Sequence, residues 1–331
     1  MNLNKYLYNY FLILFSIIPI SIILGSAISL INILLIDISF LILLIYKKNF
    51  IFFKSNTVWY LLALYLYLIF NTFIAIDYSE SVLRNFGFLR IVILFLAFNY
   101  FFHQNFFFEK MIKFWIVILS IVILDVFVEY IFGKNLLGYG EAYGNRIVSF
   151  FKDEPIVGGY INGFFLIIFG FLFNLKTKNK LYFVIFLLIL ITAIVFTGER
   201  SNTIKALIGI SLFLFAYKEI KFNHKILFFI GTFLMILIII FNSSFLKLRF
   251  YNQFQNALNS NSIYFKLYES GFQVFNNYKI FGVGNKNYRI ETCNYEANLS
   301  NENKKKYICS THPHQIYFEF LSEHGFLGTL F

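Results

Sequence analysis

Nine apolar runs occupy about half of this chain, and each has roughly the length that spans a lipid bilayer as a helix. A bilayer core of about 30 Å requires about 20 apolar residues in helical conformation. Only helices and closed barrels satisfy all of their backbone hydrogen bonds in lipid. We therefore expect an all-α, polytopic membrane protein with nine complete transmembrane helices. The runs are 8–27, 29–46, 57–76, 86–102, 112–132, 157–175, 181–198, 202–217 and 226–242.

The composition favours a membrane protein over a soluble or nucleic-acid-binding one. Hydrophobic residues make up 59% of the 331 residues and charged residues only 14%, whereas soluble domains carry about 25% charged residues. The net charge of +11 resides in small lysine groups between apolar runs, which is typical of cytoplasmic loops rather than of a nucleic-acid surface. The first run has the flanks of a signal peptide, but its length and the run directly behind it favour a retained helix.

Basic residues alternate between the loops in a way that predicts the orientation of the chain. One set of loops, which includes the N-terminus, holds twelve lysines, and the other short loops hold five basic residues. The positive-inside rule places the lysine-rich set, and with it the N-terminus, in the cytoplasm. The predicted outer segments are 77–85, 133–156, 199–201 and the long polar stretch 243–315.

These patterns divide the chain into three expected parts. Residues 1–242 form the transmembrane bundle, and residues 243–315 form an extracytoplasmic loop subdomain that is too long to be a mere connector. Residues 316–331 begin a tenth apolar run. Because this run is cut short at Phe331, we expect the chain to be part of a longer protein.

The arginines are distributed differently from the lysines. Only six of the 28 basic residues are arginines, and all six fall on or near the predicted outer side. The planar guanidinium group binds phosphate through two hydrogen bonds, which lysine cannot do. The excess therefore indicates an anionic ligand such as a diphosphate; the alternative is that single arginines cap helices or bind lipid headgroups. The six are Arg84, Arg90, Arg146, Arg200, Arg249 and Arg289.

Several polar residues stand out by their position. Arg90 lies at the edge of an apolar run, where a charge is costly unless it serves a site. Arg200 lies in a short polar break between two runs. Glu154 precedes Pro155 at a predicted helix start, where it either caps the helix or orients a group of the site. The glycines of segment 281–284 predict a turn rather than a phosphate-binding loop.

Three of the five histidines lie between Cys309 and Gly325. The only cysteines, Cys293 and Cys309, both lie in the predicted outer segment, so we expect a disulfide. A metal site is a weaker alternative, because no Cys-x-x-Cys pair supports zinc. Pro313 favours an extended backbone that points His312 and His314 to the same side, with a helix beginning near residue 315 and His324 at a surface or interface.

The histidine segment resembles a known family. Thr-His-Pro-His-Gln-Ile-Tyr at 311–317, followed by Glu-His-Gly-Phe-Leu-Gly at 323–328, is similar to the end of the large periplasmic loop in the O-antigen ligase and O-antigen polymerase superfamily. Segments 146–159, 198–201 and 281–284 match that family in the same order. The resemblance implies a GT-C-like glycosyltransferase of the bacterial inner membrane, with its large loop in the periplasm and no metal or cofactor.

The resemblance also implies substrates and roles. The enzyme takes a glycan from an undecaprenyl-diphosphate carrier to an acceptor sugar hydroxyl. His314 acts as general base or positions the acceptor, and His312 supports it. Arg200 and Arg146 hold the diphosphate. The further candidates are Arg289, Arg249, Arg90, Glu154, Gln315 and Tyr317, with Gln315 standing where the family usually has asparagine.

Two alternatives remain open in the sequence. A ligase transfers to lipid A–core, whereas a polymerase joins repeat units on the carrier; the motifs do not separate them, and we favour the ligase. A polysaccharide or lipid transporter would place facing charges at mid-membrane and show repeat symmetry. Only the acids Asp37, Asp125 and Glu129 lie inside the runs, and the sequence shows no repeat.

Overall fold

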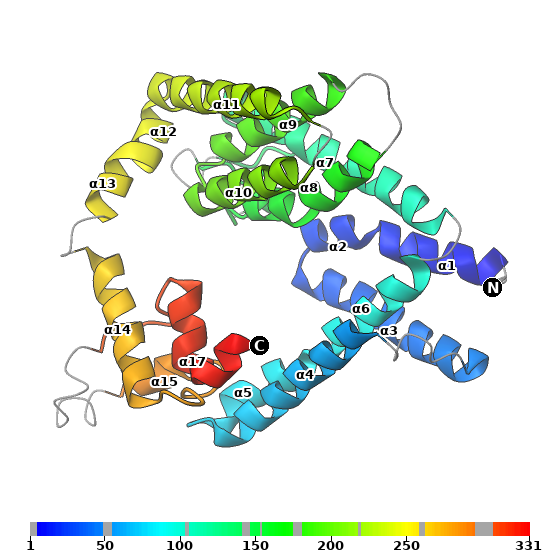
Figure 1. Cartoon of the computed structure of the whole chain (residues 1–331), viewed down its shortest axis with the longest axis vertical. Coiled ribbons are helices and arrows are strands. Elements are labelled where there is room, and N and C mark those ends of the chain that lie inside the picture. The colour runs from blue at the N-terminus through cyan, green and yellow to red at the C-terminus, as the bar shows by residue number, and fades with distance from the viewer. Residues whose placement is uncertain are drawn as a thin grey trace. The chain divides into compact units, whose positions relative to one another are not determined.

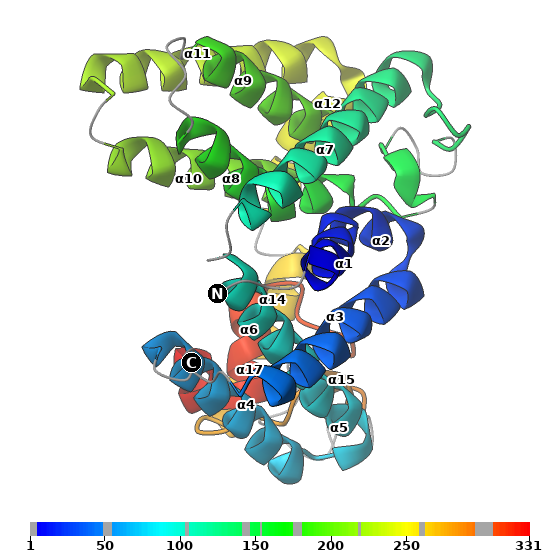
Figure 2. The ribbon, with the colours of Figure 1, turned by 90° about the vertical axis from the view of Figure 1, so that its right-hand side faces the viewer.

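The computed structural model describes residues 5–48, 55–102, 106–140, 146–152, 154–174, 181–217, 220–257, 262–294 and 307–331. These residues are mostly helical, and no strand occurs among them, which confirms the all-α class. The chain divides into two compact units (Figures 1 and 2). The first comprises Met1–Ile33 and His103–Phe254, and the second comprises Leu34–Phe102 and Gln255–Phe331.

Each predicted apolar run lies on a helix or on a pair of consecutive helices. Within the described part of the chain, six spans are long and apolar enough to cross a membrane, or seven if α1 and α2 form one bent span. Helices α9 and α10, with 16 and 17 residues, are shorter than a full span of about 20, so nine spans remain a prediction. The helices are α1 (Lys5–Ser16), α2 (Ile18–Leu24), α3 (Ser26–Lys47), α4 (Asn56–Ile74), α5 (Tyr78–Gly87), α6 (Leu89–Phe102), α7 (Phe107–Phe132), α8 (Val157–Asn174), α9 (Leu181–Phe196), α10 (Arg200–Ala216) and α11 (Phe222–Asn242).

Helix α7 is the central element of the first unit. It packs against α1, α8 and α9, and α8 also packs on α9 and α10 (Figure 1). The buried side of α7 carries the large side chains Phe107, Met111 and Trp115, all at most 4% exposed. After α11 the chain continues through α12 (Ser244–Lys247), the π-helical turn η4 (Leu248–Asn252) and α13 (Gln253–Ala257).

The second unit joins two groups of helices. Helix α4 packs on α5 and α6, and α14 (Ile263–Asn277) packs on α15 (Tyr288–Thr292) and α17 (Ile316–Leu330). The helix expected over residues 262–278 is confirmed as α14, and the Ser262 hydroxyl caps it by accepting a hydrogen bond from the Phe265 amide. The stacked rings of Tyr268 and Phe318, 5.7 Å between centroids, hold α14 against α17.

A sharp kink interrupts α17 at Gly325, whose φ of 63° and ψ of −167° are non-helical. A kink deprives the preceding carbonyls of their helical partners. Segment 281–284 supplies new ones: the amide of Val283 donates to the Ser322 carbonyl and that of Gly284 to the Glu323 carbonyl, both at 2.9 Å. The turn predicted for segment 281–284 is confirmed, and its amides bind the carbonyls that the kink of α17 leaves without helical partners.

We expect Gly282→Ala to destabilise the second unit by about 2 kcal/mol or more. Gly282 has a φ of +72°, and an added Cβ would collide with the backbone of Glu323 and His324; a left-handed alanine alone costs about 1–2 kcal/mol. Thermal unfolding of the purified protein in detergent measures the effect. Gly163→Ala is the matched control, because that helical glycine has open space around its Cβ. Equal midpoints for the two variants would refute the packing role.

The expected disulfide is confirmed, with Cys293 at the end of α15 bonded to Cys309. It ties the start of the histidine segment to α15. In the chain-entropy model, closing a loop of this size stabilises by about 3 kcal/mol. We therefore expect the double variant Cys293→Ser/Cys309→Ser to unfold at a distinctly lower temperature than the oxidised protein. A reducing agent is expected to reproduce the shift in the wild type and to leave the variant unchanged.

Candidate functional site

The two histidines of segment 307–315 lie directly against each other. The ring centroids of His312 and His314 are 4.2 Å apart, which confirms that both side chains face the same side. The prediction of an extended backbone is wrong at His314, because the φ of this residue is +57°. This left-handed conformation is uncommon for residues other than glycine and persists only where the surroundings enforce it.

The surroundings that enforce it come from α14 and α17. The side-chain oxygen of Gln315 accepts a hydrogen bond of 2.8 Å from the Phe318 amide and so caps α17. Pro313 is buried and packs on Gly271 of α14, where an added Cβ would lie 2.9 Å from the proline Cβ. The Gln315 side chain is therefore engaged in capping, and the histidine pair sits between a packed proline and a helix start.

His314 is exposed. The Tyr264 ring stands edge-on to it at 6.3 Å between centroids, while His312 Nδ1 lies 2.9 Å from the Thr311 hydroxyl. Partial desolvation lowers the pKa of His314, the charge of His312 lowers it further, and the charge of Glu319 raises it. The net result favours a neutral imidazole, which is the form that accepts a proton.

The other candidates of the second unit lie in different environments. Arg289 and Tyr317 are exposed, and so is Arg90 in the first turn of α6. His324, expected at a surface or interface, is buried with 8% exposure. Its carbonyl accepts a hydrogen bond of 2.6 Å from the Tyr67 hydroxyl, so this histidine belongs to the packed kink of α17.

In the first unit, Glu199 joins the beginnings of two helices. Its carboxylate accepts hydrogen bonds from the Gly158 amide at 2.7 Å and from the Asn202 side chain. An added Cβ at Gly158 would lie 2.9 Å from the carboxyl carbon, so only glycine permits this approach. Burial raises the pKa of Glu199, whereas the two hydrogen bonds and the charge of Arg146 lower it. Because Glu199 accepts hydrogen bonds from both Gly158 and Asn202, it holds together the N-terminal ends of α8 and α10, both of which are electropositive.

Arg146 and Arg200 are partly buried beside this junction, Arg146 close enough for its charge to act on Glu199 and Arg200 directly after it. Among the described residues neither arginine forms an ion pair, and the buried Nε of Arg146 has no hydrogen-bond partner there. Arg249 is used differently: its Nε donates to the Gly198 carbonyl at 3.3 Å and its Nη1 to the Gln253 side chain at 2.8 Å. Arg249 thus fixes the turn that precedes Arg200.

Two acids of α7 hold the loop that carries Arg146. The Glu129 carboxylate accepts from the amides of Val148 and Ser149, at 2.9 and 2.6 Å, and the Asp125 carboxylate accepts from the Ser149 hydroxyl at 2.6 Å. The sequence alone shows these two acids inside an apolar run and indicates no role for them. The sequence signal that could have identified them is their spacing of four residues near the C-terminal end of an apolar helix, because a charge there needs partners.

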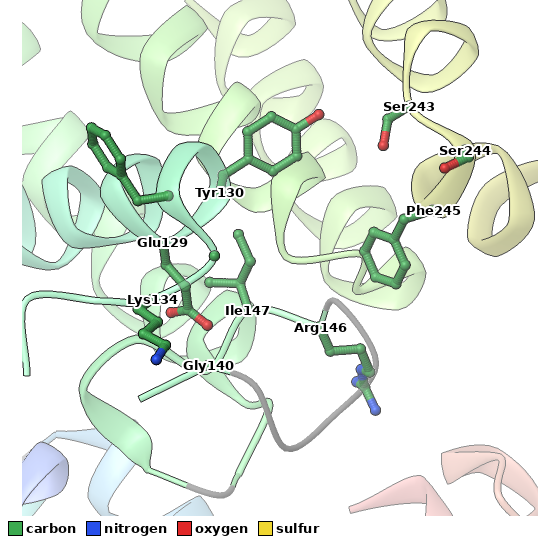
Figure 3. A pocket seen from close by; sticks show the side chains of 11 residues that line it. Glu129, Tyr130, Lys134, Gly140, Arg146, Ile147, Ser243, Ser244 and Phe245 are labelled. Carbon is green, nitrogen blue, oxygen red and sulfur yellow. The ribbon is translucent and has the colours of Figure 1, made fainter. Parts of the chain in front are cut away.

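A cavity of about 530 Å³ opens beside this loop. Figure 3 shows the Glu129 carboxylate, the Arg146 guanidinium and the hydroxyls of Tyr130, Ser243 and Ser244 around it, with the guanidinium apart from the carboxylate. Small-molecule sites typically have about 300–1,000 Å³ and a few convergent polar groups. The cavity thus offers to an anionic ligand hydrogen-bond donors and a guanidinium that forms no ion pair with any residue of described position.

The comparisons with known proteins agree with the sequence motifs. Residues 185–331 match the family model described as O-Antigen ligase. This part of the chain is similar to the O-antigen ligase family. The matched range of the O-antigen ligase domain includes the Glu199 junction, the turn at 281–284 and the histidine segment, while Arg146 precedes it. No curated protein and no solved structure matches the chain.

The match to the O-antigen ligase family supports a membrane glycosyltransferase of the ligase or polymerase type, and the family implies lipid-linked glycan substrates. The apolar helices agree with a multi-pass membrane protein. Glu154 is exposed ahead of α8. In the described part of the O-antigen ligase domain and of the residues before it, no group of three His, Cys, Asp or Glu side chains has the arrangement of a metal site.

Proposed function

We propose that this protein transfers a glycan from an undecaprenyl-diphosphate carrier to a sugar hydroxyl of lipid A–core at the periplasmic face of the inner membrane. The observation that carries the proposal is the exposed, left-handed His314 inside the matched family range. His314 is exposed on a left-handed backbone, and strain of this kind concentrates at functional sites.

On the donor side, Arg146 and Arg200 bind the diphosphate. Both lack an ion-pair partner among the residues with described positions, and the electropositive ends of α8 and α10 add to their field. As the glycosidic bond breaks, negative charge grows on the diphosphate. Positive groups that are already in place stabilise that charge without reorganising. Arg249 positions Arg200 indirectly, because it donates a hydrogen bond to the Gly198 carbonyl in the turn that precedes Arg200.

On the acceptor side, His314 takes the proton of the incoming hydroxyl. The hydroxyl oxygen attacks the anomeric carbon, the bond from that carbon to the diphosphate breaks, and the electron pair leaves with the diphosphate. Attack from the side opposite the leaving group inverts the anomeric centre. Arg289 and Tyr317, both exposed in the second unit, are available to the acceptor glycan.

The test is transfer in vitro from a defined undecaprenyl-diphosphate glycan, with lipid A–core and a second carrier-linked glycan offered together as competing acceptors. The ligase proposal expects product on lipid A–core that His314→Ala abolishes. Product on the carrier-linked glycan alone would indicate that the protein is a polymerase and not a ligase. No product on either acceptor, in a preparation with the wild-type unfolding temperature, would contradict the proposal as a whole.

A further inference from the structure

A second cavity, of about 650 Å³, lies in the first unit between α8, α9, α10 and α11 and has no part in the proposed transfer. Its lining is almost entirely apolar, and its volume lies within the range of small-molecule sites. Its apolar lining is Phe169, Phe173, Val184, Leu187, Leu188, Leu214, Ile220, Leu227, Phe228 and Met235, and its few other residues are His224, Lys225, Gly231 and Thr232.

A buried ammonium group is part of the cavity lining. Lys225 is only 6% exposed, and its Nζ donates to the carbonyl of Tyr217 at 2.7 Å and to that of Phe215 at 3.4 Å. An ammonium has three donors, so one is left over. No carboxylate of the described residues pairs with this charge, and a buried charge without a counter-charge is costly. His224, next to it, also lines the cavity.

A second polar atom lies among the apolar residues. Thr232 is 2% exposed and lines the cavity, and its hydroxyl has no hydrogen-bond partner among the described residues. Gly231 beside it has open space where a Cβ would stand. A glycine inside a helix costs about 1 kcal/mol relative to alanine, and here its effect is to keep the cavity open.

We propose that this cavity binds one anionic phospholipid, with an acyl chain among the apolar side chains and the phosphate at Lys225 and His224. The choice of occupant rests on charge complementarity: an apolar cavity lined by a buried cation, which has no carboxylate partner among the described residues, fits an apolar chain that carries an anion. Lys225 belongs to the lysine-rich set of loops that the positive-inside rule assigns to the cytoplasm. Basic pockets between transmembrane helices on that side bind anionic headgroups.

Native mass spectrometry of the full chain in detergent tests the proposal with two lipids that share the same oleoyl chains, phosphatidylglycerol and phosphatidylcholine. We expect one phosphatidylglycerol per chain, bound at least about tenfold more tightly than phosphatidylcholine. Gly231→Leu adds a large side chain at the cavity lining, where its Cβ meets no protein atom within 4 Å, and it is expected to weaken binding of phosphatidylglycerol at least about tenfold. Gly163→Leu, on α8 with open space around it and outside the cavity lining, is the matched control and keeps wild-type binding.

Lys225→Met tests the contribution of the headgroup to binding separately from that of the acyl chain. It is expected to remove the preference for phosphatidylglycerol while phosphatidylcholine binds as before. Equal affinity of the wild type for the two lipids would overturn the proposal, and so would undiminished phosphatidylglycerol binding by Gly231→Leu. The Gly231→Leu arm is independent of the buried lysine, so the test holds even if Lys225→Met fails to fold.

Discussion

Replacing His314 is expected to lower glycan transfer about 100-fold or more, because a positioned general base contributes about 10²–10⁴ to a rate. The informative variant is His314→Asn, alongside His314→Ala. Asparagine tolerates the left-handed backbone that His314 adopts at φ +57°, so the variant keeps the loop conformation and removes only the imidazole. Single-turnover transfer from the lipid-linked donor measures the effect. Wild-type rates in both variants would exclude His314 as the base.

The pH dependence of transfer provides a second readout for the same residue. Desolvation and the charge of His312 lower the pKa of His314. A base acts in its neutral form, so activity is expected to persist below the ordinary histidine pKa of about 6.5 and to fall only at lower pH. Removing the positive neighbour with His312→Gln is expected to move this acid limb to higher pH. Glu319→Gln, which removes a charge that raises the pKa of His314, is expected to move it to lower pH.

Arg200→Lys is expected to reduce turnover by about 10²–10³, the usual cost of losing one group that stabilises developing charge. Lysine keeps the charge but lacks the planar fork that contacts two phosphate oxygens. Arg200 lies partly buried at the start of α10, where no described residue pairs with it. If it stabilises the leaving diphosphate, the loss falls on kcat more than on KM.

Lys205→Gln is the matched control for Arg200→Lys, because it removes an exposed cation from the same helix. It is expected to leave the rate unchanged and so to separate a specific contact from a general loss of positive charge. Full activity in Arg200→Lys would remove this residue from the diphosphate site. A loss of equal size in Lys205→Gln would show that long-range electrostatics, and not a specific contact of Arg200, causes the lower rate.

Local features of the fold were predictable from the sequence, and features that join distant segments were not. The apolar runs, the helix near residue 316 and the Cys293–Cys309 disulfide depend on composition and short spacings, and the structure confirms them. The kink at Gly325 depends on backbone groups some 40 residues earlier in the chain. No local pattern encodes that pairing, so the sequence predicts His324 at a surface or interface although it is buried.

The same limit applies to the candidate site. The sequence identified Glu199 only as part of a polar break, whereas its carboxylate reaches the Gly158 amide across 41 positions. Asp125 and Glu129 were visible only as acids in an apolar run, and their partners lie in a loop about 20 residues away. Chemistry-bearing residue types were therefore predictable, while the groups that position them required the three-dimensional arrangement.

The histidine segment is fastened at both of its ends. The disulfide at Cys309 holds its beginning, and the hydrogen bonds between segment 281–284 and the kinked α17 hold its end. A loop anchored in this way loses little freedom when a ligand binds, since its entropy was already lost during folding. We expect acceptor choice to follow from the fixed shape presented around His314, so that mutations which loosen either anchor broaden acceptor range before they abolish transfer.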